Sequence, residues 1–230
     1  RCPDRHNPDV LAPFVEQPKT FAMFSENLKW NLIMDLNNVG ELNLACQQGN
    51  ASELIQIAEA LQSKKTVQIA EEIYRRHYLP DPVKLVLITG PSASGKTTFC
   101  KRLSIQLLTC GIRPMSFSTD DYFVNRADTP LDKNGDYDYE ALEAIDLKLL
   151  NEHLNALLHG QAVTIPRYNF KTGLREWYDT PLKLDDRSII IMEGIHGLNP
   201  NLTPDVDENR KFKIYASCFT SVSLDNVNRI

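Results

Sequence analysis

The stretch that decides the fold is VKLVLITGPSASGKT, residues 83–97. Its first half, Val83–Thr89, is an apolar run of strand length, and its second half matches G-x-x-x-x-G-K-[ST] at every fixed position. Gly90 and Gly95 permit backbone angles that turn successive amides inward and leave room for phosphate oxygens. The helix expected over Gly95–Cys110 would present free N–H groups and a positive dipole end to an anion. The stretch therefore predicts a phosphate-binding loop between a buried strand and a helix.

This loop is expected to hold ATP and Mg²⁺. Lys96 should reach the β- and γ-phosphates, and the Thr97 hydroxyl should hold the metal ion. The other residues predicted to line the nucleotide are Gly90, Ser92, Ala93, Ser94, Gly95 and Thr98. The loop by itself does not separate a kinase from a GTPase, an ATPase motor or a nucleotide-dependent switch.

The residues after the loop alternate between strand and helix patterns. A long helix with an apolar side is expected over Asp138–His159, and the predicted strands are Arg113–Ser118, Ala162–Pro166, Arg187–Met192 and Lys211–Ala216. Such alternation is typical of a parallel sheet covered on both faces. The predicted fold class is α/β, a P-loop NTPase-type parallel sheet covered by helices and preceded by a small helical segment.

The residues before the loop follow a different pattern. Residues 1–25 carry four prolines and predict an extended arm. The pattern is helical from Asn27 to about Tyr78. Asn50 and Glu53 form a capping-box pattern, and an apolar stripe follows at Leu54, Ile57, Ala58 and Leu61. A break is expected near Lys64–Lys65. We therefore predict an N-terminal arm and helical segment over residues 1–80, and a P-loop kinase domain over residues 81–230.

Composition narrows the class of protein. The chain of 230 residues has a net charge of −5 and a pI near 5.6, which argues against a nucleic-acid partner. No apolar run approaches the roughly 20 residues that span a bilayer, so we expect no membrane role. Five dispersed cysteines predict reduced thiols and a cytoplasmic location. The chain opens at Arg1 without a methionine, which suggests a piece of a longer protein.

Carboxylates follow two of the predicted strands. Asp120 and Asp121 come directly after Arg113–Ser118, at the carboxyl end of the sheet where open α/β folds place ligands. A carboxylate there can take the proton of an attacking hydroxyl or orient Mg²⁺. Glu193 ends another apolar run and is the expected Mg²⁺ partner of Thr97. The alternatives are a solvated acidic turn for the aspartates and a simple strand-end charge for Glu193.

Five motifs in order now point to a family. GPSASGKTT, STDDYF, YDYEAL, IPRYNFKTGLR and IIMEGI resemble the uridine kinase and phosphoribulokinase superfamily, in its uridine kinase-like branch, over about residues 83–217. The stretch Phe14–Tyr78 is similar to the segment that precedes the kinase in long bacterial-type uridine kinase-like proteins. The resemblance implies Mg²⁺-dependent transfer of the γ-phosphoryl of ATP to a nucleoside hydroxyl.

The resemblance also implies roles for single residues. Asp120 matches the catalytic aspartate that accepts the proton of the 5′-hydroxyl, and Glu193 matches the Mg²⁺-linked glutamate. Asp138 matches the aspartate that holds the ribose hydroxyls, although it also sits where a helix N-cap belongs. Tyr168 matches an aromatic residue beside the nucleobase, with strand-end packing as the alternative. Arg175 matches a basic residue of the same β-hairpin.

Two departures from the family pattern bear on the acceptor. Uridine kinases carry a histidine in the hairpin that reads the pyrimidine edge, whereas this chain has Gly173 at the matching place. We therefore expect a weak or relaxed base preference. The family also has an arginine-rich lid after the strand at Lys211–Ala216, and this chain shows only Arg229 before it stops at Ile230. Either the lid lies in residues not given, or this piece lacks part of its catalytic equipment.

Two alternatives stay open. A sugar-phosphate or cofactor-precursor acceptor would need extra basic residues to hold its own charge, and candidates are Arg126, Lys133, Arg167 and Lys171. A nucleotide-dependent switch or scaffold would bind ATP and transfer nothing. The expected partner is a small-molecule acceptor, most simply a nucleoside. The sequence does not determine the oligomeric state, and a homo-oligomer is compatible with it.

Overall fold

The computed structural model describes residues 17–217 and 222–225. The described residues divide into two compact units: residues 64–217 form one, and residues 17–63 together with 222–225 form the other. Helix α3 (Ala51–His77) runs through the division without a break, so the expected break near Lys64–Lys65 is wrong. Lysine is a good helix former and neither position is a glycine or proline, so nothing local stops the helix there. The assignment of residues 1–80 and 81–230 to two domains stays a prediction.

Helix α1 (Pro18–Met34) begins earlier than the sequence suggests. Pro18 stands in its first turn, where a missing N–H costs nothing and the fixed φ suits the helix. The expected arm is therefore wrong for residues 18–25, and residues 1–16 lie outside the described residues. Helix α2 (Val39–Gln47) is capped by the Asn38 side chain, which accepts a hydrogen bond from the Glu41 amide at 2.9 Å. In the described part of the chain, no helix is both long and apolar enough to cross a bilayer.

The larger unit is built on the predicted parallel sheet. Its strands are β1 (Leu85–Thr89), β2 (Arg113–Ser118), β5 (Ser188–Glu193) and β6 (Lys211–Tyr215), in the order β2-β5-β1-β6. All three pairings are parallel, and Leu87 lies beside Met192 on one side and Lys213 on the other. The four strands coincide with predicted runs to within two residues at each end.

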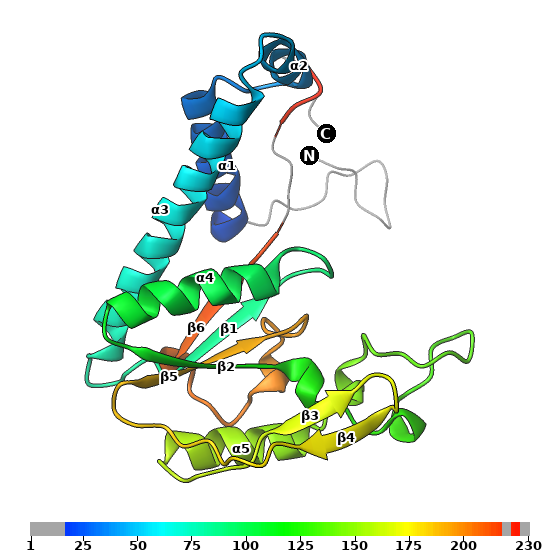
Figure 1. Ribbon diagram of the computed structural model, residues 1–230. Helices are drawn as coiled ribbons and strands as arrows, with labels where there is room; N and C mark the ends of the chain where they lie inside the picture. Colours follow the sequence, from blue (N-terminus) through cyan, green and yellow to red (C-terminus); the bar gives the residue numbers. More distant parts are fainter. Residues whose placement is uncertain (1–16, 218–221, 226–230) are drawn as a thin grey trace, which may run out of the picture. The chain divides into compact units, whose positions relative to one another are not determined.

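Two apolar layers explain why β1 and β5 read as unbroken hydrophobic runs. Alternate side chains of a strand point to opposite faces, so a sheet covered on both faces needs apolar residues throughout. Helices α4 (Lys96–Thr109) and α5 (Leu147–Leu158) cover opposite faces of the sheet (Figure 1). On the α4 face Val86 and Ile88 pack with Leu103 and Leu107. On the α5 face the core includes Leu85, Leu87, Leu150, Leu154, Ile190 and Met192.

The predicted long helix over Asp138–His159 is wrong in its first half. Helix α5 begins at Leu147, and the Asp146 side chain caps it by accepting from the Leu149 amide at 3.0 Å. The preceding residues are held instead by tertiary pairing, because the Val124 amide donates to the Ala144 carbonyl and Phe123 forms a bridge with Ile145. Apolar spacing alone cannot separate a helix from such a docked segment.

An antiparallel hairpin follows α5. Its strands are β3 (Pro166–Asn169) and β4 (Leu174–Trp177), with Tyr168 opposite Arg175. The strand predicted over Ala162–Pro166 is therefore displaced, since only its last residue belongs to β3. Val163 makes an isolated bridge with Leu182, and their amides and carbonyls exchange hydrogen bonds of 2.9 and 2.7 Å. The ring of Trp177 in β4 lies 6.4 Å from that of His153 in α5, measured between centroids.

Candidate active site

The phosphate-binding loop joins β1 to α4 at the carboxyl end of the sheet. Gly95, just before α4, has φ 83° and Ala93 has φ 58°, so two residues of the loop take left-handed angles. Such angles curl the backbone so that successive amides converge, which is the geometry of an anion-binding concavity. The pattern predicted the position of Gly95 but not the strain at Ala93. The predicted residues Ser92, Ala93, Gly95, Thr97 and Thr98 are all exposed.

Gly90 is required for a reason that only the fold reveals. A Cβ at this position would lie 2.0 Å from the Ala216 carbonyl oxygen, which is closer than any side chain can come to backbone. Ala216 is held there because its amide donates to the Thr89 carbonyl at 2.7 Å, extending the pairing of β6 with β1. Gly90, the first glycine of the loop, is therefore needed because the chain at the end of β6 passes too close for a side chain.

One polar atom of the loop is unsatisfied. The Ser94 hydroxyl oxygen is buried and has no hydrogen-bond partner among the residues that the structure describes. A buried hydroxyl without a partner costs about 1–3 kcal/mol, so such a group usually has a ligand or solvent partner. This orphaned hydroxyl fits a phosphate group in the loop.

The Lys96 ammonium has partners in the loop itself. It donates to the carbonyl oxygens of Gly90 at 3.0 Å and Pro91 at 2.8 Å. These contacts hold the charge over the curled backbone, where phosphate oxygens would accept from the same ammonium. Lys96 also lies close enough to Asp120 to act on its carboxylate electrostatically.

Thr97 and Glu193 meet across the sheet. The Thr97 hydroxyl, in the first turn of α4, donates to Glu193 Oε1 at the end of β5 at 2.8 Å. The two residues are 96 apart in the sequence, and the parallel pairing of β1 with β5 brings them together. A hydroxyl and a carboxylate so placed form a pair of hard oxygen donors.

The Thr97–Glu193 pair suits the open coordination of Mg²⁺ and does not form a metal site enclosed by protein ligands. Among the described residues no three His, Cys, Asp or Glu side chains gather into a metal-binding group. Mg²⁺ is usually held by one or two carboxylates together with waters and substrate phosphates, so a dedicated cage is not needed. Thr97, Glu193 and Asp120 are the residues that could contribute oxygen atoms.

Asp120 lies in a partly desolvated, acidic environment. It stands in the 3₁₀ turn Thr119–Tyr122, directly after β2. Burial, and then the carboxylates of Glu193 and Asp121, raise the pKa of Asp120 above its usual value, while the Lys96 ammonium partly offsets them. Perturbed carboxylates of this kind are common where a protein needs a general base. The structure therefore brings Asp120, Lys96, Thr97 and Glu193 to one end of the sheet.

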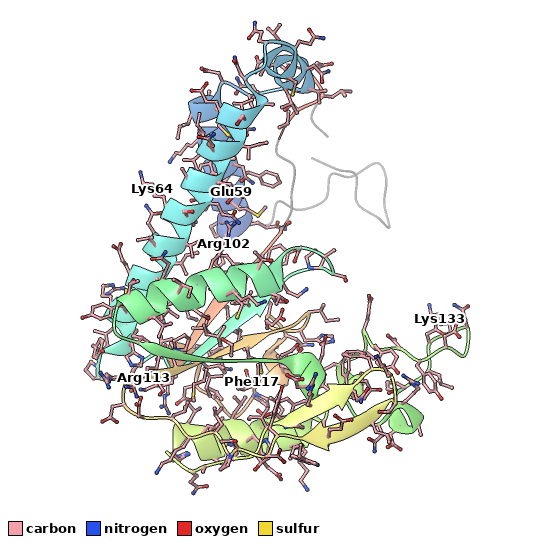
Figure 2. The ribbon with its side chains drawn as sticks, in the orientation of Figure 1. Glu59, Lys64, Arg102, Arg113, Phe117 and Lys133 are labelled. Carbon is pink, nitrogen blue, oxygen red and sulfur yellow. The ribbon has the colours of Figure 1, made fainter. Side chains whose placement is uncertain are left out.

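The Asp121 carboxylate has different partners from that of Asp120. Its carboxylate accepts from the Ser118 amide at 3.2 Å, completing a capping box with the Ser118 hydroxyl. It also lines a cavity of about 440 Å³ at the outer edge of β2, together with Phe117 and Tyr178. Figure 2 shows Phe117 below the β2 ribbon, on the side of α5. The two neighbouring aspartates thus have separate surroundings.

The Asp138 side chain is used to hold a turn. Its Oδ1 accepts from the amides of Glu140 at 3.0 Å and Ala141 at 3.1 Å. This is the cap-like contact given above as the alternative to a ribose contact, although the turn leads into a 3₁₀ segment and not into α5. Its role toward a ribose stays a prediction.

Tyr168 belongs to the core. It is 4% exposed, and its ring lies against Phe123, Tyr139 and Phe170 with centroid distances of 5.5, 6.4 and 5.0 Å. Burial and a hydrogen bond with Tyr139 raise the pKa of its hydroxyl to about 12. We call Phe123, Tyr139, Tyr168 and Phe170 the aromatic cluster. Phe170, which no motif singled out, is its exposed member at 60%.

Arg175 braces the hairpin from inside. Its Nη1 forms an ion pair with the Asp146 carboxylate at 3.0 Å, and its Nη2 donates to the carbonyls of Tyr122 and Phe123. The side chain is only 16% exposed. These contacts tie β4 to the cap of α5 and to the turn that carries Asp120, so Arg175 can position Asp120 without touching a substrate.

Sequence reasoning missed two contacts around Asp120. The buried Thr119 hydroxyl lies 3.5 Å from Asp120 Oδ1, and a Cβ on Gly194 would come within 1.9 Å of it. Gly194 is therefore needed for the turn to approach β5. His153 of α5 is half-buried, and its Nδ1 lies 3.2 Å from the hydroxyl of Tyr122. The Thr119–Gly194 and His153–Tyr122 contacts leave no spacing signal, because each joins residues from distant elements.

Comparison with known proteins places these features in a family. Residues 85–227, more than half of the chain, match the model described as the phosphoribulokinase / uridine kinase family. A uridine kinase of Lactobacillus helveticus is 32% identical over 117 residues, which are 51% of this chain and 54% of that protein. Uridine kinase-like protein 3 of Arabidopsis thaliana is 31% identical over 72% of this chain and 33% of its own length. The chain thus spans about half the length, or less, of these relatives.

A solved structure gives the same picture. A structure titled as a possible uridine kinase from Bacillus stearothermophilus is 26% identical, with a TM-score of 0.51, and the match covers 66% of this chain and 79% of that one. The similarity supports the α/β fold with its parallel sheet.

Proposed function

Because the chain belongs to the phosphoribulokinase / uridine kinase family, we propose that it transfers the γ-phosphoryl group of ATP to a hydroxyl of a nucleoside, with Mg²⁺. The observation that carries the proposal is the 2.8 Å hydrogen bond between Thr97 and Glu193, with the Asp120 carboxylate and the Lys96 ammonium beside it. A nucleotide-binding scaffold needs the loop, but it has no need of a general base with a raised pKa at its mouth.

Each residue has a separate task in this proposal. The loop amides and the Ser94 hydroxyl bind the phosphates, and Lys96 places a positive charge on the oxygens of the transferred group. Thr97 and Glu193 would hold Mg²⁺, which would supply positive charge to the phosphate oxygens. Asp120 accepts the proton of the attacking hydroxyl, since its raised pKa lies closer to neutral pH than that of a free aspartate.

The nucleoside is the finer part of the proposal. Names of similar proteins favour it, and Tyr168 and Arg175 contact the segment that carries Asp120. The sugar-phosphate alternative needs basic side chains that converge near Asp120. Of its four candidates, Lys133 lies at the outer tip of the 131–137 loop, away from the sheet (Figure 2), whereas Arg167 acts electrostatically on the Asp121 carboxylate. The names of the similar proteins are what favours a nucleoside.

A cytoplasmic location belongs to the same proposal. Cys46, Cys100 and Cys110 are free thiols in the described part of the chain, as expected for a protein in a reducing compartment.

The test is a transfer assay with the full chain. ATP labelled in its γ-phosphoryl group is incubated with uridine, cytidine, adenosine, guanosine and inosine, each beside its 2′-deoxy form, and with pentose phosphates. We expect Mg²⁺-dependent 5′-phosphorylated ribonucleosides and poorer use of the deoxy forms. Transfer to a sugar phosphate alone would replace the nucleoside by that acceptor. ATP binding without transfer to any acceptor would favour the nucleotide-dependent switch.

A further inference from the structure

The tip of the β3–β4 hairpin leaves no room for a side chain at residue 173. Gly173 has φ 73°, which side chains rarely tolerate, and a Cβ there would lie 2.8 Å from both Cβ and Nε of Arg126. Gly173 is itself buried. The Arg126 side chain therefore fills the space beside the hairpin tip, and any side chain on residue 173 would have to displace it.

Arg126 is held in one orientation by three hydrogen bonds. Its amide donates to the Gly173 carbonyl at 2.8 Å, its Nε donates to the Tyr139 hydroxyl at 3.2 Å, and its Nη2 donates to the Phe170 carbonyl at 2.7 Å. A guanidinium has five N–H donors. Two side-chain hydrogen bonds leave donors for another group, in a plane whose direction is already set.

The guanidinium lies on the acceptor side of the site. Both of its side-chain partners, Tyr139 and Phe170, belong to the aromatic cluster. The first member of that cluster, Phe123, follows Asp120 by three residues, and its ring lies 6.2 Å from that of Phe170. Phe170 is largely exposed, so this edge of the cluster is open to a ligand. A planar ring against the cluster would present its edge to Arg126.

We infer that Arg126 is a specificity-determining residue that selects nucleosides with a keto oxygen, in place of an amino group, at position 4 of a pyrimidine or position 6 of a purine. The inference rests on the proposed nucleoside kinase function. A guanidinium donates hydrogen bonds, accepts none and keeps its proton. It can therefore pair with a carbonyl oxygen, whereas an exocyclic amino group would set donor against donor and lose a hydrogen bond.

This inference changes the base preference expected from Gly173 alone. An absent side chain on the hairpin suggested a relaxed choice among bases. With Arg126 in the same space, the choice follows the exocyclic group, so uridine is preferred to cytidine and inosine to adenosine. The contact with Arg126 does not distinguish a pyrimidine from a purine.

Matched pairs of nucleosides test the inference. Uridine and cytidine differ at the keto or amino group of position 4, and inosine and adenosine differ in the same way at position 6. We expect kcat/KM to favour the keto member of each pair by about 10–100-fold, the size of a hydrogen bond to a charged group. In Arg126→Gln the side-chain carbonyl can accept from an amino group, so the ratio should fall to within about 3-fold.

Two further variants separate charge from position. Arg126→Lys keeps a donor-only group and should keep the direction of the preference. Lys171→Gln removes a positive charge from the exposed tip of the same hairpin and should leave the ratios unchanged. The thermal unfolding midpoint of each variant is measured alongside.

The outcomes are distinguishable. Equal use of both members of each pair by the wild type would overturn the inference whether or not any variant folds, and so would a keto preference that persists unchanged in well-folded Arg126→Gln. Either result leaves nucleoside phosphorylation standing. If ATP binds and no nucleoside is phosphorylated, the proposed function fails, and the inference fails with it.

Discussion

The phosphate side and the acceptor side of this site differ in how their polar groups are used. On the phosphate side, Ser94 has an unsatisfied hydroxyl, and Thr97 and Glu193 bond mainly to each other. On the acceptor side, Asp138 holds a turn, and both Nη atoms of Arg175 are used within the fold, although its Nε is buried without a hydrogen-bond partner among the described residues. The difference shows that a residue of a motif can contact a ligand itself, or can instead hold in place the segment that contacts the ligand. Four predictions on three variants, Asp120→Asn, Lys96→Ala and Arg175→Met, test this division.

The largest expected effect is at the border of the two sides. Asp120→Asn should lower kcat by roughly 10²–10⁴ and change ATP affinity only a few-fold, because it removes the proposed general base but leaves the loop intact. Asp121→Asn is the matched control and should do much less, since an amide oxygen can still accept from the Ser118 amide. Steady-state kinetics measure both. A larger loss at Asp121 would reverse the assignment.

On the phosphate side, Lys96→Ala should lower kcat/KM by roughly 10²–10³, the usual loss when one electrostatic contact to the transition state is removed. Its partners are carbonyls of its own loop, so the unfolding midpoint should stay within about 2 °C of wild type. Lys101→Ala, on the exposed side of the same helix, controls for loss of charge. Near-wild-type transfer by Lys96→Ala would mean that Lys96 does not act on the transferred phosphoryl group.

On the acceptor side, Arg175→Met should act first on stability. Loss of the ion pair with Asp146 and of the bonds to two carbonyls should lower the free energy of unfolding by about 1.5–3 kcal/mol. Arg167→Met, an exposed change across the same hairpin, should stay within about 0.5 kcal/mol. Urea unfolding measures both. An unchanged stability together with a raised KM for the acceptor would make Arg175 a substrate residue.

The smallest effect is a gain in stability. The folded state raises the pKa of Asp120, so the stability contributed by this carboxyl is present below its unfolded pKa and is lost as pH rises through the folded value. Asp120→Asn should therefore unfold about 1–3 °C higher than wild type at pH 7, with the difference shrinking toward pH 4. The exposed Asp205→Asn serves as the control. A lower midpoint for Asp120→Asn at pH 7 would mean that the carboxylate is stabilised by the fold.

Local patterns determined much of this protein. The loop 90–97 was predicted because each of its fixed residues has a task that depends on near neighbours, namely tight turns, helix-end amides and one lysine. Strands β1 and β5 were predicted because burial on both faces demands unbroken apolar runs. The start of α5 was missed because pairing of Phe123 with Ile145 overrides a helical spacing.

Tertiary structure alone decided how the acceptor side is built. Thr119 fits against Gly194, and Arg126 fills the space that Gly173 leaves, and in both cases the partners come from different elements. Spacing along the chain carries no record of such contacts, because strand order and the docking of the hairpin set them. The sequence by itself thus determined a phosphate-binding α/β fold, and only the packing of distant segments decided which polar side chains remain for a ligand.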